Sequence, residues 1–149
     1  MHKFSTALAV WAIFIFISGV MFPIELTNGA SDVTQVLHSY TIYGFFSLIP
    51  IVFYGGFLSF MADWIAKHYT RFRETMSLGI HIAGGIVVYF ATANIDLTIL
   101  AVVATLLFFL VDRALSLLGE KSGGTQLANS LSLFIGCSGV LTMIMASTI

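Results

Sequence analysis

The residues with the clearest potential for chemistry are ionisable side chains within or at the ends of long apolar stretches: Asp63, His81, Asp112 and Arg113. Ionisable groups at membrane depth are costly and therefore suggest function, and a histidine near carboxylates can exchange protons near neutral pH. The pattern predicts a cytoplasm-facing Asp/His site, either proton-linked or specific for a substrate headgroup. The structural alternative is that Asp112 pairs locally, Arg113 extends to the lipid headgroups and His81 bonds a neighbouring helix.

The elements that position these residues are predicted to be helices in lipid. Hydrophobic residues make up 58% of the 149-residue chain and charged residues only 9%, whereas soluble domains carry about 25% charged residues. The five apolar segments do not alternate with period two, and backbone polar groups in lipid must bond within each segment. We therefore expect an all-α polytopic transmembrane helix bundle, forming a single domain over residues 1–149, with spans at 4–22, 40–62, 76–93, 97–118 and 127–148.

Charge sets the expected orientation. With five spans, the basic residues all fall on or near one side, namely Lys3, Lys67, Arg71, Arg73, Arg113 and Lys121. Because basic residues near helix ends are retained in the cytoplasm, we expect a plasma-membrane protein with its N-terminus inside and its C-terminus outside. Lys67, Arg71 and Arg73 either bind anionic lipid headgroups or serve only as orientation signals. The Asp63–Lys67 spacing also predicts an intrahelical pair.

Small residues at four-residue spacing predict faces for close helix packing, because backbones in lipid associate through such residues. Pro50, which lacks a backbone donor, should bend the second helix. The packing faces are either intramolecular or a homo-oligomer interface, and they comprise Gly55 and Ser59 on the second segment and Ala128, Ser132 and Gly136 on the fifth.

The sequence lacks the motifs that mark several functional classes. The chain has no HExxH, GxSxG or phosphate-loop motif, and no basic run of the kind that binds nucleic acid. Cys137 is the single cysteine, and His38 and His81 are expected on opposite sides, which argues against a haem held between them. We expect no catalytic residues, no metal site and no cofactor.

The stretch Tyr54-Gly55-Gly56-Phe57-Leu58-Ser59, followed by Asp63 and Lys67, resembles a pattern in an uncharacterised family of small multi-pass membrane proteins of Gram-positive bacilli. The run Leu107-Phe108-Phe109-Leu110-Val111-Asp112 is similar to the fourth helix of the same family. The resemblance covers less than half of the chain and implies no activity. It implies about four spans, so a four-span bundle without the fifth segment is the alternative architecture.

Two functional hypotheses follow. The first is a non-enzymatic accessory, partner-binding or immunity-type subunit, whose partners are membrane lipid and either another membrane protein or a second copy of the chain. The second is a small oligomeric transporter or channel that uses the cytoplasm-facing Asp/His site.

Overall fold

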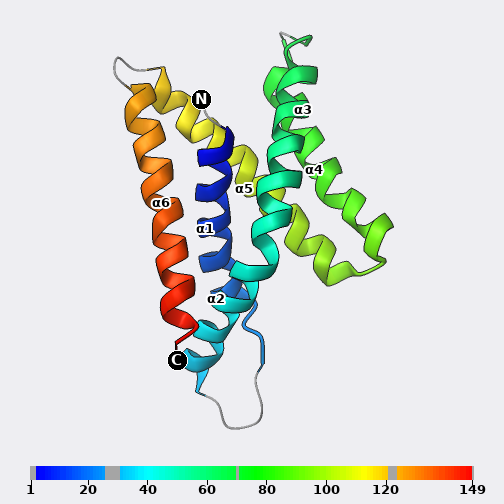
Figure 1. Ribbon diagram of the computed structural model, residues 1–149. Coiled ribbons are helices and arrows are strands. Elements are labelled where there is room, and N and C mark those ends of the chain that lie inside the picture. The colour runs from blue at the N-terminus through cyan, green and yellow to red at the C-terminus, as the bar shows by residue number, and fades with distance from the viewer. Residues whose placement is uncertain (1–2, 26–30, 70, 121–123, 149) are drawn as a thin grey trace.

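The computed structural model describes residues 3–25, 31–69, 71–120 and 124–148. Five of its helices are long and apolar enough to cross a membrane, judged by length and composition. The described chain contains helices and no strands, which confirms the predicted all-α bundle (Figure 1). The elements are α1 (Lys3–Met21), α2 (Asp32–Ile49), η1 (Pro50–Gly55), α3 (Gly56–Ala66), α4 (Arg73–Thr92), α5 (Ile95–Gly119) and α6 (Gly124–Ala146).

The second long helix begins at Asp32, earlier than the expected residue 40. Ser31 caps it, because the Ser31 Oγ accepts a hydrogen bond from the Thr34 backbone N–H at 3.3 Å. Asp32 in the first turn also favours a helix start. The sequence alone placed residues 23–39 in an external segment, so this helical start was not foreseen. The Asn28-Gly29 pair predicts a turn from the sequence, and it lies outside the described residues.

The bend expected at Pro50 takes the form of a π-helical segment. Elements α2, η1 and α3 form one long helix over Asp32–Ala66, and its middle part, η1, has π-helical turns. Proline cannot donate a backbone hydrogen bond, and wider π turns are one way in which a helix accommodates that loss. The change of course lets α2 contact α1 while α3 contacts α4 (Figure 1).

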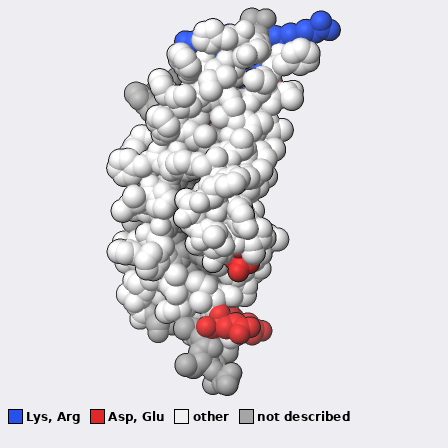
Figure 2. Space-filling model, turned by 90° about the vertical axis from the view of Figure 1, so that its right-hand side faces the viewer, with Lys and Arg blue, Asp and Glu red and all other residues white. Residues whose placement is uncertain are grey.

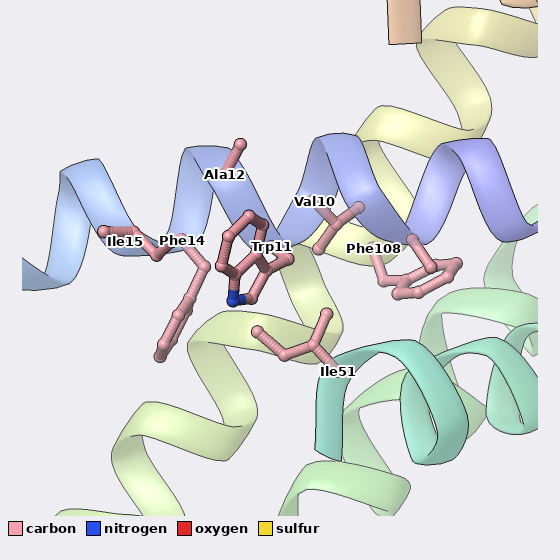
Figure 3. Packing of buried hydrophobic residues seen from close by; sticks show 8 residues of the cluster. Val10, Trp11, Ala12, Phe14, Ile15, Ile51 and Phe108 are labelled. Carbon is pink, nitrogen blue, oxygen red and sulfur yellow. The ribbon is translucent and has the colours of Figure 1, made fainter. Parts of the chain in front are cut away.

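Helix α1 lies at the centre of the bundle and contacts α2, α5 and α6. Its buried side chains Val10, Trp11 and Phe14 form the core with Ile51 of η1 and Phe108 of α5 (Figure 3). The indole Nε1 of Trp11 donates a hydrogen bond to the Gly44 carbonyl of α2 at 2.9 Å. The first apolar segment is therefore the element around which the other helices assemble.

The small residues expected to pack helices are buried inside the bundle. Ala128, Ser132 and Gly136 lie on one buried face of α6, and a side-chain carbon added at Gly136 would lie 2.9 Å from Leu8 Cβ of α1. A carbon added at Gly55 would lie 2.9 Å from the Phe108 ring. These faces are thus occupied by intramolecular contacts.

The short connection at Asn94 makes α4 and α5 an antiparallel hairpin. Asn94 caps α5, because its Oδ1 accepts a hydrogen bond from the Leu97 backbone N–H at 3.1 Å. Ala93 ends α4 in the left-handed conformation with φ of 49°. The two helices run side by side (Figure 1), which brings His81 of α4 near the carboxyl-terminal half of α5.

Candidate functional site

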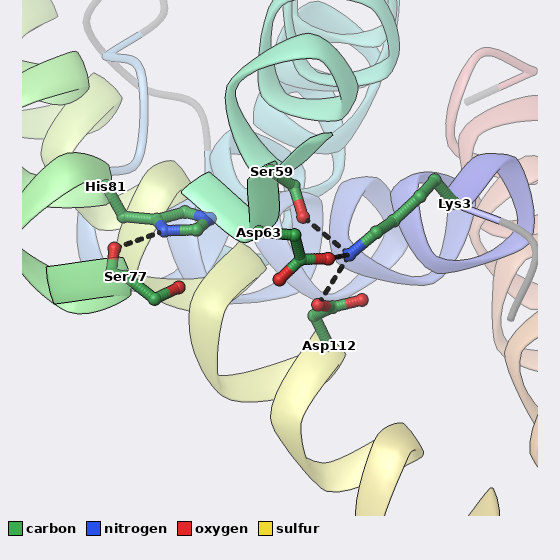
Figure 4. A network of polar contacts seen from close by, with 6 residues as sticks. All are labelled: Lys3, Ser59, Asp63, Ser77, His81 and Asp112. Atoms are coloured by element: carbon green, nitrogen blue, oxygen red, sulfur yellow. Dashed lines mark hydrogen bonds and ion pairs between the residues drawn. The ribbon is translucent and has the colours of Figure 1, made fainter. Parts of the chain in front are cut away.

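A charged cluster joins the start of α1 to two other helices (Figure 4). The Lys3 Nζ lies 2.6 Å from Asp63 Oδ2 on α3 and 2.8 Å from Asp112 Oδ2 on α5. It also donates a hydrogen bond to Ser59 Oγ at 3.0 Å. An ammonium group has three donors, so all three are used. Lys3 therefore fastens the amino-terminal end of α1 to α3 and α5.

These contacts correct two expectations. Asp112 does not pair locally, since its partner Lys3 comes from the other end of the sequence. Asp63 pairs with Lys3 instead of forming the expected pair with Lys67, whose Nζ lies 5.9 Å from the centre of the Trp64 ring. Both expectations used neighbours along one helix and overlooked contacts between helices.

His81 lies on α4 and is only 2% exposed. Its Nδ1 is 2.8 Å from the Ser77 carbonyl oxygen one turn earlier, so it bonds its own helix and not a neighbouring one as the structural alternative expected. Because a carbonyl only accepts, Nδ1 carries the hydrogen, and Nε2 of the neutral ring is then an acceptor. Among the described residues this buried Nε2 has no hydrogen-bond partner.

His81, Asp63 and Asp112 line a common cavity of about 250 Å³, here called the polar chamber. A second buried acceptor, Oδ1 of Asp112, also has no hydrogen-bond partner within the described part of the chain. Figure 4 shows the His81 ring directed from α4 toward Asp63 and Lys3. The full lining of the polar chamber is Lys3, Asp63, Arg73, Glu74, Ser77, His81, Phe109, Asp112, Arg113 and Ser116.

The charged side chains that line the polar chamber sum to zero, because Lys3, Arg73 and Arg113 are positive and Asp63, Glu74 and Asp112 are negative. Around Lys3 itself, two aspartates face one lysine, which gives a local excess of one negative charge. Arg113 pairs with Glu74 across α5 and α4 at 2.8 Å, with side chains that are 41% and 48% exposed. Asp63 is exposed to a similar extent, at 44%, whereas Asp112 is only 19% exposed, so solvent screens the charge of Asp112 least.

All four members of the predicted polar cluster, Asp63, His81, Asp112 and Arg113, therefore line one cavity. Arg73 lies at the start of α4 and also reaches it, whereas Lys67 and Arg71 are exposed after α3. Sequence reasoning assigned Lys3 only to orientation and gave no role to Glu74 or Ser77. The available signal was charge balance, because two aspartates at one level call for a nearby cation.

A second cavity of about 480 Å³ lies beside η1 and is open on one side; it is here called the apolar groove. Its four hydroxyl groups donate hydrogen bonds to backbone carbonyls: Tyr43 to Phe22, Ser47 to Tyr43, Tyr54 to Gly84 and Thr105 to Val102. The groove is lined by Phe14, Ile42, Tyr43, Phe46, Ser47, Pro50, Ile51, Tyr54, Gly55, Val88, Leu97, Leu100, Ala101, Ala104, Thr105 and Phe108.

Within the described ranges, no group of three or more His, Cys, Asp or Glu side chains is placed to hold a metal ion. The chamber residues instead form a site for hydrogen bonding and charge pairing. No protein-family model, curated protein or solved structure matches this chain. The resemblance to the family of Gram-positive bacilli therefore stays a prediction, and the function is inferred from the geometry of the chamber and the groove.

Proposed function

We propose that this chain is a multi-pass protein of the plasma membrane whose polar chamber binds a small cation that donates hydrogen bonds. Five apolar helices support the membrane location. The proposed orientation, with the N-terminus in the cytoplasm and the C-terminus outside, rests on charge. Figure 2 shows Lys and Arg at one end of the visible face and Asp and Glu nearer the other, as expected when basic residues are retained inside.

The observation that carries the cation proposal is the pair of unpartnered acceptors, His81 Nε2 and Asp112 Oδ1, in one cavity. A buried polar atom without a partner costs about 1–3 kcal/mol. A ligand with at least two N–H or O–H donors would satisfy both atoms. The unpartnered oxygen of Asp112 belongs to a carboxylate, which favours a positively charged donor because charge-assisted hydrogen bonds are stronger than neutral ones. A protonated amine meets both requirements.

Depth favours the transporter hypothesis over the accessory hypothesis. Asp112 lies seven positions before the end of α5 at Gly119, which corresponds to about 10 Å along the helix. Because α5 has 25 residues and is about 37 Å long, it exceeds a hydrocarbon layer of about 30 Å, so the chamber would lie at most about 10 Å inside that layer on the cytoplasmic side. A cavity at this depth, with charged walls and unpartnered acceptors, suits the cytoplasmic uptake site of a small cation transporter.

The test uses ethylammonium, a water-soluble primary ammonium ion, and the protein in phosphatidylcholine nanodiscs. Calorimetry should give saturable binding, weakened at least about tenfold by Asp112→Asn, because charged hydrogen bonds contribute about 1.5–3 kcal/mol. Asp96→Asn, which changes an exposed aspartate in the first turn of α5, is the matched control and should bind like wild type. Tetramethylammonium has the charge but no N–H donor and should bind at least about tenfold more weakly.

Three results would contradict the proposal: no heat beyond that of empty nanodiscs, equal binding of both cations, or equal loss in the two variants. Proteoliposomes then test transport. Accumulation of labelled ethylammonium should depend on Asp112. Binding without accumulation would leave the chamber a cation site but would remove the transporter assignment.

A partner-binding role is the second candidate function, and a specific feature of α4 favours it. Gly79 and Ala83, four residues apart, are exposed on its outer face, and a carbon added at Gly79 would have no neighbour within 4 Å. Faces of this kind support close contact between helices in lipid. In a Cys137→Ser background, Ala83→Cys should form disulfide-linked dimers in native membranes if the partner is a second copy, and exclusively monomeric protein would contradict that role.

A further inference from the structure

We propose that the ligand is a lipophilic primary amine, with its ammonium group in the polar chamber and its hydrocarbon chain in the apolar groove. The inference rests on the proposed cation site and adds the class of substrate. It also gives Phe108 a role as the partition between the two cavities.

The two cavities share a wall on α5. Phe108 lines the apolar groove and is 1% exposed. Its ring centre lies 6.4 Å from that of His81, which lines the polar chamber. The next residue, Phe109, also lines the chamber, with its ring centre 5.8 Å from that of His81. The chamber and the groove therefore meet at the contact between His81 and Phe108.

The lining of the apolar groove suits a hydrocarbon chain and provides few polar groups for a ligand. Each of its four hydroxyl groups already donates its hydrogen to a backbone carbonyl, so an acceptor group of a ligand would lose its bonds to water there without a hydroxyl donor to replace them. Its volume of about 480 Å³ falls within the range of about 300–1,000 Å³ typical of small-molecule sites. Phe46 and Leu97, both exposed, lie at the groove, which suits a chain that enters sideways from the bilayer.

The two cavities suit chemically different parts of one ligand. The chamber requires a cation with N–H donors for His81 Nε2 and Asp112 Oδ1, and the groove requires an apolar chain. Phe108 also lies close to Gly55 of η1, where an added carbon would lie 2.9 Å from the ring. A ligand that occupies both cavities must therefore displace the Phe108 ring from its contact with His81.

The experiment compares ethylammonium with hexylammonium by calorimetry, using the protein in phosphatidylcholine nanodiscs and empty nanodiscs as the blank for partitioning. Two buried methylene groups strengthen binding about tenfold, so the four extra groups should give about a hundredfold gain. Hexyltrimethylammonium, which has the chain but no N–H donor, should bind at least about tenfold more weakly than hexylammonium. Equal binding of the two primary amines would overturn the inference and leave the cation site intact, whereas binding of neither would overturn both.

The position of the chain is tested with Ala104→Trp, which places a large side chain in the groove. The affinity ratio of hexylammonium to ethylammonium should fall from about a hundred to below about ten. Leu110→Trp on the same helix, at an exposed position outside both linings, should keep the ratio. An unchanged ratio in Ala104→Trp would place the chain elsewhere.

A second measurement does not depend on the folding of a variant. A hexylamine that carries a diazirine at its far end should label peptides of α5 that contain Leu100 and Ala104 in the wild-type protein, as read by mass spectrometry. Excess hexylammonium should suppress this labelling. Labelling confined to α6, or labelling that excess ligand does not suppress, would contradict the groove as the site of the chain.

Discussion

Lys3 and Asp112 are 109 positions apart in the sequence, yet Lys3 Nζ lies 2.8 Å from Asp112 Oδ2. This ion pair connects α1 to α5, and Lys3 also pairs with Asp63 of α3. It also fixes the composition of the chamber, because Lys3 occupies one oxygen of Asp112 and leaves the other without a partner. The Asp112 carboxylate therefore takes part both in the ion pair that holds α1 and in the proposed cation site.

The fastening role of Lys3 can be measured through stability. Lys3→Met should lower the free energy of unfolding by about 1–3 kcal/mol, because it leaves two neighbouring aspartates without their common cation. Thermal unfolding in a mild detergent should show a lower midpoint than wild type. Lys67→Met, at an exposed position after α3, is the control and should unfold like wild type. A Lys3→Met midpoint equal to that of the control would show that the ion pairs do not hold α1 in place.

Helix packing gives a second prediction. Gly136→Leu should destabilise the protein by about 1–3 kcal/mol, because the new side chain collides with Leu8 of α1. Gly79→Leu makes the same chemical change on the exposed face of α4, where an added carbon meets nothing within 4 Å. Its unfolding midpoint should stay near that of wild type. Equal effects of the two substitutions would mean that α6 does not pack on α1 through Gly136.

The unpartnered nitrogen of His81 predicts opposite effects on stability and on binding. His81→Phe removes a buried acceptor that lacks a donor, so the unfolding midpoint should stay the same or rise. Ethylammonium binding should weaken at least about tenfold, because one of its two acceptors is gone. Loss of both stability and binding would instead assign His81 a structural role.

The proposed topology predicts the fate of reporters fused to the chain. A C-terminal alkaline phosphatase, active only outside the cytoplasm, should be active when fused after residue 149. A fusion after Thr92, at the end of α4 on the opposite side from the basic residues, should behave in the same way. A fusion after Gly119 should be inactive. An active fusion after Gly119 would reverse the proposed orientation.

The sequence predicted the helical architecture well because apolar length is a local property. It located five long helices and grouped Asp63, His81 and Asp112 at one level. It misplaced the start of α2, since the polar turn after Ser31 is helical through capping and not through hydrophobicity. It did not predict the role of Lys3, because the spacing of residues along one helix gives no information about a contact between residues that are far apart in the sequence. The apolar groove was not foreseen either, because its lining comes from α1, α2, η1, α4 and α5, whose arrangement in space is not a local property of the sequence.

In the proposed site, His81 Nε2 accepts a hydrogen bond from a cation in the polar chamber. The most direct measurement is ¹⁵N NMR of the His81 ring in nanodiscs during titration with ethylammonium, with the signals assigned from the His81→Asn spectrum. The Nε2 signal should move and saturate, while Nδ1, which is held by the Ser77 carbonyl, should move much less. Tetramethylammonium at the same concentration should leave both signals in place. An Nε2 signal that does not move when ethylammonium is added, or that moves equally with both cations, would contradict the proposed hydrogen bond from the cation to His81.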